Sequence, residues 1–303
     1  MTMHLKFSDE VASAKLDGAP IVALESTIIT HGMPFPQNIE TAREVEHVVR
    51  EADAIPATIA IMNGTVLVGL SDEELEALAQ AEDVRKVSRA DLAATLADGV
   101  TGATTVAATM ICAKLGGIEV FATGGIGGVH RGAELSFDIS ADLQEFALSP
   151  VTVVAAGAKA ILDIPKTLEV LETLGVPVIS YGQDEIPAFW SRNSGLNAPL
   201  RMDNPEIIAQ SFRMKQNLGL SGGQLIANPI PAEDEIAASV LTPHIEQALA
   251  EVETKGIAAK EVTPFLLQRI FELTNGASLT ANIALVKNNA RLAAEIASAL
   301  NNC

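Results

Sequence analysis

Two side chains capable of covalent or acid chemistry follow short apolar runs in this sequence. Lys159 lies among small residues in "VTVVAAGAKAILD" (151–163), and Glu25 follows "PIVAL" (20–24). The lysine, which we expect near the start of a helix, either extends its charge to water along an apolar stem or is poorly solvated. Poor solvation would favour a neutral, nucleophilic amine that can form an imine. Glu25 is held either by a cap or ion pair, or in an apolar pocket that favours the protonated carboxyl of a general acid.

A glycine-rich stretch, "TGGIGGVHRG" (123–132), could bring backbone N–H groups close to an anion. It matches neither a Walker A motif nor a dinucleotide fingerprint, so an anion loop and a structural turn both remain open. His130 beside the glycines favours the anion loop modestly. Ser140 is expected to cap the following helix. Asp138 and Asp142 are either oxygen ligands for a hard divalent cation or ordinary caps and solvated charges.

Two further polar residues have equally open roles. Lys86 lies in the locally basic stretch "RKVSRADL" (85–92), where it either faces solvent or meets a substrate phosphate. Asn282 lies in "SLTANIALVKNNARLAAEIA" (278–297), on the same helical face as Leu285 and Val286. A buried asparagine needs hydrogen-bond partners, and these are more often structural than functional.

The order of apolar segments predicts the elements that must position these residues. Buried strands alternate with amphipathic helices through the centre of the chain, which is typical of βαβ units. Asn63-Gly64 between two apolar runs predicts a hairpin, and Ser71 with Glu74 predicts a capping box. Polar clusters follow several strands, and such ends carry the sites of parallel sheets. We therefore expect an α/β protein with three layers, α/β/α, and a mostly parallel central sheet with helices on both faces.

A single domain over residues 1–303 is the simplest organisation. Residues 1–19 are expected to form an N-terminal extension. Residues 183–203, "QDEIPAFWSRNSGLNAPLRMD", contain the only Trp and interrupt the alternation, which favours a lid or an oligomer contact.

Composition excludes several classes of protein. The net charge of −18 argues against nucleic-acid and membrane partners, which require a basic surface. Hydrophobic residues make up 48% of the chain, enough for a large core, and two cysteines are too few for a disulfide framework. With no signal-like segment at the start, we expect a cytoplasmic protein.

Several stretches, in order along the chain, resemble the pseudouridine-5'-phosphate glycosidase family, whose fold is shared with indigoidine-synthesis A-type proteins. They are "VALESTIITHGMPFPQN", "PATIAIMNG", "KVSRADL", "GATTVAATM", "FATGGIGGVHRGAELSFDISADL", "VVAAGAKAILD", "ANPIP" and "AKEVTPFLLQRIFELT". The similarity extends from about residue 20 to the C-terminus.

The resemblance implies an enzyme, a C-glycosidase classed among the carbon–oxygen lyases. It would reversibly cleave pseudouridine 5'-phosphate into uracil and ribose 5-phosphate through a lysine-linked, ring-opened ribose. The family pattern implies Lys159 and Glu25 as catalytic residues and Asp138 as the ligand of one divalent metal per subunit, typically Mn²⁺. The implied substrate contacts are Lys86, Val106, Thr123, His130, Ser140, Ala141, Asp142 and Asn282. A homotrimer is also implied.

Three alternatives stay open from the sequence. One is a Schiff-base, aldolase-like lyase acting on another sugar phosphate, which would not need a uracil pocket. Another is an indigoidine-synthesis A-type protein. The third is a sugar-phosphate or nucleotide sensor that binds without turnover.

Overall fold

In a computed structural model of the chain, residues 4–257 and 262–303 are described. Parts of two sequence predictions therefore lie outside the described residues. They are residues 1–3 of the N-terminal extension and residues 259–261 of the stretch "AKEVTPFLLQRIFELT".

Eleven described strands form one mixed, mostly parallel sheet. They are β1 (Leu5–Phe7), β2 (Ile21–Leu24), β3 (Ile55–Met62), β4 (Thr65–Val68), β5 (Arg85–Val87), β6 (Gly102–Thr104), β7 (Val120–Ala122), β8 (Thr152–Ala155), β9 (Val178–Tyr181), β10 (Leu200–Met202) and β11 (Gln224–Ala227). Their order is β1-β4-β3-β2-β7-β8-β11-β9-β10, and a branch of β6 and β5 joins at β3. Among these pairs, β3 is antiparallel to β4 and to β6, and the others are parallel. The predicted α/β class with a mostly parallel sheet is confirmed.

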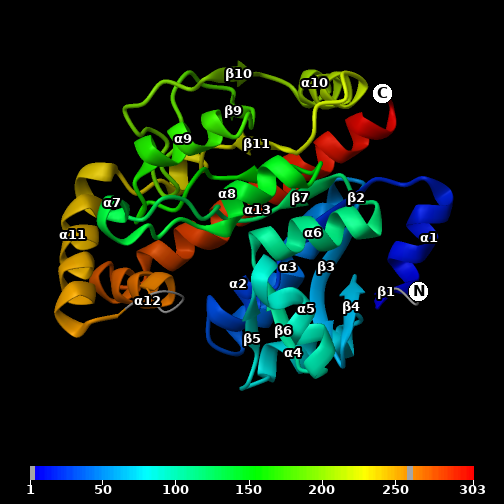
Figure 1. Cartoon of the computed structure of the whole chain (residues 1–303), viewed down its shortest axis with the longest axis horizontal. Helices are drawn as coiled ribbons and strands as arrows, with labels where there is room; N and C mark the ends of the chain where they lie inside the picture. Colours follow the sequence, from blue (N-terminus) through cyan, green and yellow to red (C-terminus); the bar gives the residue numbers. More distant parts are fainter. Residues whose placement is uncertain (1–3, 258–261) are drawn as a thin grey trace.

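The helices flank this sheet (Figure 1). They are α1 (Asp9–Asp17), α2 (Thr27–His31), α3 (Gln37–Glu51), α4 (Asp72–Gln80), α5 (Arg89–Asp98), α6 (Val106–Gly116), α7 (Ala133–Ser136), α8 (Ala141–Leu148), α9 (Ile164–Thr173), α10 (Pro205–Asn217), α11 (Ala238–Lys255), α12 (Val262–Leu273) and α13 (Ala277–Asn301), with a 3₁₀ turn η1 (Ala232–Asp234). The long α13 packs on β2, β7 and β8 and against α3 and α10, whereas α6 packs with α8. None of the helices within residues 4–257 and 262–303 combines the length and apolarity needed to cross a membrane.

Local sequence signals account for several element ends. Asn63 (φ 51°) and Gly64 (φ 67°) form the predicted hairpin turn between β3 and β4. The Ser71 hydroxyl accepts the N–H of Glu74, and the Glu74 carboxylate accepts the N–H of Ser71, which confirms the capping box of α4. Pro165 lies in the first turn of α9 as predicted.

Both segments singled out at the sequence level contribute to the packed structure. In the N-terminal segment, β1 pairs in parallel with β4, and α1 follows it. In residues 183–203, Trp190 is buried, and its indole N–H donates to the Ser278 carbonyl (3.2 Å) and to Asn282 Oδ1 (2.6 Å) on α13. A lid or oligomer role for residues 183–203 stays a prediction.

The hairpin provides a matched test of packing at glycine. Gly64 and Gly99 have nearly the same φ (67° and 68°), but a Cβ on Gly64 would lie 2.8 Å from the Leu96 carbonyl oxygen, and one on Gly99 would meet no atom within 4 Å. Gly99→Ala should lower the free energy of unfolding by about 1 kcal/mol, because only the left-handed conformation is penalised. Gly64→Ala should cost about 1 kcal/mol more, because of the added steric clash. Urea unfolding of both variants measures the difference, and equal losses would contradict the packing argument.

Candidate functional site

Three neighbouring parallel strands end at the same edge of the sheet. In the strand registers, Leu24 of β2 lies beside Ala122 of β7, and Ala122 lies beside Val154 of β8. Glu25 and Thr123 therefore follow adjacent strands side by side, and the chain leaving β8 carries Lys159. This is the edge where a parallel sheet places its site.

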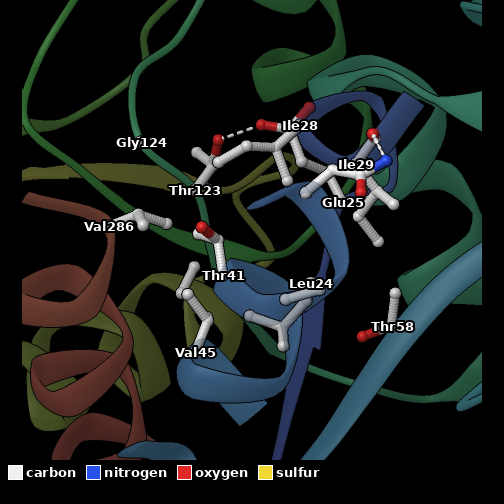
Figure 2. A pocket seen from close by; sticks show the side chains of 13 residues that line it. Leu24, Glu25, Ile28, Ile29, Thr41, Val45, Thr58, Thr123, Gly124 and Val286 are labelled. Atoms are coloured by element: carbon white, nitrogen blue, oxygen red, sulfur yellow. Dashed lines mark hydrogen bonds between the residues drawn. The ribbon is translucent and has the colours of Figure 1, made fainter. Parts of the chain in front are cut away.

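Two hydroxyl groups orient Glu25. Thr27 donates to Oε2. Thr123 donates to Oε1, as Figure 2 shows. Thr123 is buried, and its own N–H donates to the Val154 carbonyl of β8 (3.0 Å). Glu25 is half-buried. Its carboxylate is fixed by one hydroxyl from its own segment and by one from the segment that follows the neighbouring strand β7.

A small cavity of about 20 Å³ lies beside Glu25. Leu24, Ile28, Val45 and Val286 give it an apolar lining, and Thr41 is among its polar members. A volume of this size holds about one water molecule. This cavity is therefore too small for a nucleotide-sized ligand.

Lys159 lies in the loop between β8 and α9. The prediction that it lies near a helix start is wrong, because the chain turns at Gly157 (φ 83°) and α9 begins only at Ile164. The backbone N–H of Lys159 donates to the Ile126 carbonyl (3.1 Å) of the glycine-rich loop. The lysine backbone is thereby tied to the segment after β7, and its side chain is partly buried.

His130 interacts electrostatically with three other predicted site residues, Asp138, Lys159 and Lys86. Burial lowers the pKa of His130, Asp138 opposes this shift, and the positive charges of Lys159 and Lys86 lower the pKa further. The Nδ1 atom of His130 is 4.0 Å from Asp138 Oδ2. Residues from β5, the glycine-rich loop and the loop after β8 therefore lie near enough to His130 to influence its charge, although they are far apart in the chain.

The starts of two helices meet beside this cluster. Ser140 caps α8 as predicted, with its hydroxyl accepting the Asp142 N–H (3.2 Å). Asp142 is buried, and its two carboxylate oxygens accept the N–H groups of Ala107 on α6 (2.9 Å) and Gly127 (2.8 Å). Position 127 requires glycine for steric reasons, because a Cβ there would lie 2.7 Å from Asp142 Oδ2. The Asp142 carboxylate is thus a clamp between α6, α8 and the glycine-rich loop.

The clamp leaves a hydroxyl without a partner at the start of α6. An N-cap side chain normally accepts an N–H from the first turn of its helix. Here Asp142 accepts the N–H of Ala107, and within the described part of the chain the buried Oγ1 of Thr105, the N-cap residue, has no hydrogen-bond partner. Val106, a predicted substrate contact, follows directly. The sequence analysis missed Thr105. The available signal was its position between the end of a strand and the start of a helix.

The same edge contains a buried amide that the sequence analysis also missed. Asn289 Nδ2 donates to the carbonyls of Thr123 (2.8 Å) and Gly124 (3.3 Å), and its Oδ1 accepts from Asn228 Nδ2 (3.0 Å). Asn289 lies two turns after Asn282 on α13, so the helical periodicity could have indicated it. It connects the chain ends of β7 and β11, and through Thr123 it supports Glu25.

Asp138 is the acidic residue best suited to a metal in this region. Its side chain is 40% exposed, whereas both oxygens of Asp142 are already occupied by amides. Within the described ranges, no three His, Cys, Asp or Glu side chains form a group that could hold a metal ion. A hard cation at Asp138 would therefore keep most of its ligands as water or substrate oxygens, which Mg²⁺-like ions accept.

Comparisons with known proteins agree over the whole chain. The family model described as "Indigoidine synthase A like protein" matches residues 10–299. Proteins named pseudouridine-5'-phosphate glycosidase from Paracoccus denitrificans (strain Pd 1222) and Jannaschia sp. (strain CCS1) are 72% and 69% identical. The first alignment covers 98% of both chains, and the second covers 99% of both. Among solved structures, the prealnumycin C-glycosynthase AlnA in complex with ribulose 5-phosphate is 39% identical, with a TM-score of 0.92 over 100% of this chain and 98% of that one. An indigoidine synthase A-like protein from Thermotoga maritima is 37% identical, with a TM-score of 0.90 over 99% and 98%.

The Asp142 clamp makes a prediction for stability. Asp142→Asn should lower the free energy of unfolding by about 2 kcal/mol, because an amide NH₂ would replace one oxygen that accepts a backbone N–H. Asp163→Asn is the matched control, since Asp163 Oδ1 caps α9 by accepting the Lys166 N–H (3.1 Å) and asparagine caps helices equally well. Chemical unfolding measures both changes, and similar losses in the two variants would show that no clamp exists.

Proposed function

This chain belongs to the indigoidine synthase A-like protein family, and from that membership we propose that it is a pseudouridine-5'-phosphate glycosidase. It is an enzyme that cleaves pseudouridine 5'-phosphate to uracil and ribose 5-phosphate. The observation that carries this conclusion is the 72% identity to a relative of that name over 98% of both chains. Because phosphorylated nucleosides do not cross membranes unaided, we assign the activity to the cytoplasm.

The substrate poses a specific chemical problem. The carbon of a C-glycosidic bond is a poor leaving group, so direct hydrolysis is slow. In the proposed route, the Glu25 carboxyl protonates the ring oxygen while the neutral amine of Lys159 attacks C1'. The C1'–N bond forms, the C1'–O bond breaks, and the ribose ring opens.

The second half of the reaction breaks the carbon–carbon bond. The new C1'–N bond leaves a positive charge on nitrogen, which loses a proton to the Glu25 carboxylate formed in the first half. The nitrogen lone pair then forms a C1'=N double bond, and the C1'–C5 electron pair leaves with uracil, whose C5 takes up a proton. Water then adds to the imine and releases ribose 5-phosphate, which regenerates the Lys159 amine. Thr27 and Thr123 would hold Glu25 in a fixed orientation during these steps. Such positioning is a major source of rate enhancement.

The remaining predicted residues divide between the two ends of the substrate. At the phosphate end, Lys86 supplies charge, and the starts of α6 and α8 supply the N–H groups of Val106 and Ala141, which no helical carbonyl accepts. The Ser140 hydroxyl adds a donor at the same helix start. Asp142 would hold this helix start in place, because its carboxylate is engaged by two amides and its own N–H donates to the Ser140 hydroxyl.

At the uracil end we place Thr123, His130 and Asn282. The Oδ1 atom of Asn282 accepts the Trp190 indole N–H, so the group left for the base is the Nδ2 donor, which matches a uracil carbonyl. The buried Trp190 would thus fix this amide from the side of residues 183–203.

We further propose one divalent cation per subunit, Mn²⁺ by family resemblance, held by Asp138. The exposed carboxylate of Asp138 supports this assignment. When bound, the cation would supply positive charge and ordered water molecules near the base. Asp138 is oriented through its backbone, since its N–H donates to Ser136 Oγ (3.2 Å) and its carbonyl accepts the His130 N–H (3.0 Å).

The reverse reaction, formation of a C-glycoside, is a second candidate activity of the same site. It is favoured by the structural neighbour named a C-glycosynthase, which was solved with a pentulose phosphate. An aldolase-like lyase acting on another sugar phosphate would use the same lysine without releasing uracil.

Assembly as a homotrimer is supported by an exposed apolar segment beside the site. In the stretch 135–139, Leu135 is 90% exposed, Phe137 is 83% exposed and Ile139 is 43% exposed. Three large apolar side chains in five residues are an unfavourable solvent surface and a suitable subunit contact. The contact would lie directly next to Asp138, so assembly would shape the site.

The covalent step can be tested by trapping. Incubation with pseudouridine 5'-phosphate and Mn²⁺ should release uracil, and borohydride added during turnover should reduce the imine to a stable ribose-phosphate adduct on Lys159. Peptide mass spectrometry locates the adduct. Lys159→Ala should lose at least about 10⁴-fold in kcat with an unchanged unfolding transition. Sugar-phosphate adduct without uracil release would favour the aldolase-like lyase, and an adduct on another lysine would contradict the role given to Lys159.

The assembly can be tested separately. Phe137→Ser should shift the mass found by light scattering from three chains towards one, because the substitution removes the largest exposed apolar side chain of the contact. Leu16→Ser is the matched control, since Leu16 is 89% exposed on α1. A trimer that persists in Phe137→Ser, or a monomeric wild-type enzyme, would contradict the proposed contact.

A further inference from the structure

Three separate chain segments carry the proposed phosphate contacts, and they have to keep a fixed spacing. Lys86 lies on β5, Val106 is the first residue of α6, and Ser140 caps α8. A phosphate bound by all three requires that none of the segments can move away from the other two.

Two of the three spacings are fixed by contacts already described or by strand pairing. The strands β5 and β6 are parallel, with Lys86 beside Ala103, and the Thr105 N–H donates to the Val87 carbonyl (2.9 Å). This pairing fixes β5 relative to the start of α6. The Asp142 carboxylate fixes the start of α6 relative to α8 through the Ala107 N–H.

The third spacing is fixed by an ion pair. Arg89 Nε donates to Glu145 Oε2 (2.6 Å), and Arg89 Nη2 donates to Oε1 (3.1 Å). The Ser149 hydroxyl also donates to Oε1 (2.5 Å). Two parallel hydrogen bonds between a guanidinium and a carboxylate fix orientation as well as distance. The pair joins the first residue of α5, just after β5, to the second turn of α8.

The positions of Arg89 and Glu145 are unfavourable for the stability of the fold. The Glu145 side chain is fully buried, whereas that of Arg89 is 48% exposed. An arginine in the first turn of a helix also opposes the helix dipole, which favours negative side chains there. Apolar residues of similar volume often match or exceed a buried ion pair in stability. Stability alone therefore does not explain why this pair connects these two segments.

We propose that Arg89 is a positioning residue for the phosphate subsite, because its bidentate pair with Glu145 fixes Lys86 against the start of α8. This inference rests on the proposed function. The Arg89–Glu145 pair closes a ring of three connections, β5 to α6, α6 to α8, and α8 to α5. Without it, α5 and the strand that carries Lys86 lose this bidentate connection to α8.

Steady-state kinetics with pseudouridine 5'-phosphate and Mn²⁺ test the proposal. Arg89→Gln should raise KM about tenfold, because the phosphate contacts lose their spacing, while kcat at saturation changes less than about twofold. Ribose 5-phosphate should weaken as a competitive inhibitor by the same factor. Arg89→Lys keeps the charge without the two parallel bonds and should lie between Arg89→Gln and wild type.

The control is Arg85→Gln on β5, the strand that carries Lys86. Arg85 pairs with Asp98 of α5 at 2.8 Å, so this variant also removes an ion pair of β5 but leaves the connection to α8 intact. It should keep the wild-type KM. A purely structural role for Arg89 would lower the amount of folded enzyme, and hence the maximal rate, with no change in KM.

Two outcomes separate this inference from the proposed function. If wild-type enzyme releases no uracil, the proposed function fails. If wild-type turnover is normal and KM is unchanged in Arg89→Gln, or rises equally in Arg85→Gln, only the positioning role fails. Thermal melts report the folded fraction, and if Arg89→Gln does not fold, Arg89→Lys decides by the same KM criterion.

Discussion

The site depends on the parallel pairing of β2, β7 and β8. This pairing ends three strands at one edge of the sheet, where Glu25, Thr123 and the loop to Lys159 follow one another in adjacent positions. Backbone hydrogen bonds set the lateral spacing of these groups, so it varies little. The candidate site residues thus depend on sheet geometry, and the loops have only to direct side chains from fixed starting points.

Buried polar side chains join the helices and loops around this edge of the sheet. Asp142 joins α6, α8 and the glycine-rich loop, Glu145 joins α8 to α5 through Arg89, and Asn289 joins the chain ends of β7 and β11. Each of these groups is buried and hydrogen-bonded, which is the condition under which a polar group in a core adds specificity without a large desolvation cost. Around the site, these polar contacts add to apolar packing in fixing the relative positions of the helices.

The local electrostatics differ from those of the whole chain. The protein carries a net charge of −18, yet its proposed substrate is a phosphate ester. Lys86 and Lys159 both lower the pKa of His130, so two positive charges act on this one region beside the carboxylate of Asp138. A local arrangement of this kind would suit a single anion, whereas nucleic acid needs an extended basic surface.

The sequence alone determined the features that depend on neighbouring residues. The Asn63-Gly64 turn, the Ser71 capping box, Pro165 in the first turn of α9 and the alternation of strands and helices all follow from local backbone preferences and hydrophobic period. The sequence motifs also identified the family, because Glu25, Asp138 and Lys159 each lie within a continuous stretch of characteristic residues.

Only the tertiary structure decided the contacts between distant segments. Asn289 lies 166 residues from Thr123, and Arg89 lies 56 residues from Glu145, so no local pattern could pair them. The loop position of Lys159 was mispredicted for the same reason, since its backbone bonds to Ile126 of another segment. Hydrophobic period reports which face of an element is buried, but the partner of a buried polar group is set by which elements the fold brings against it.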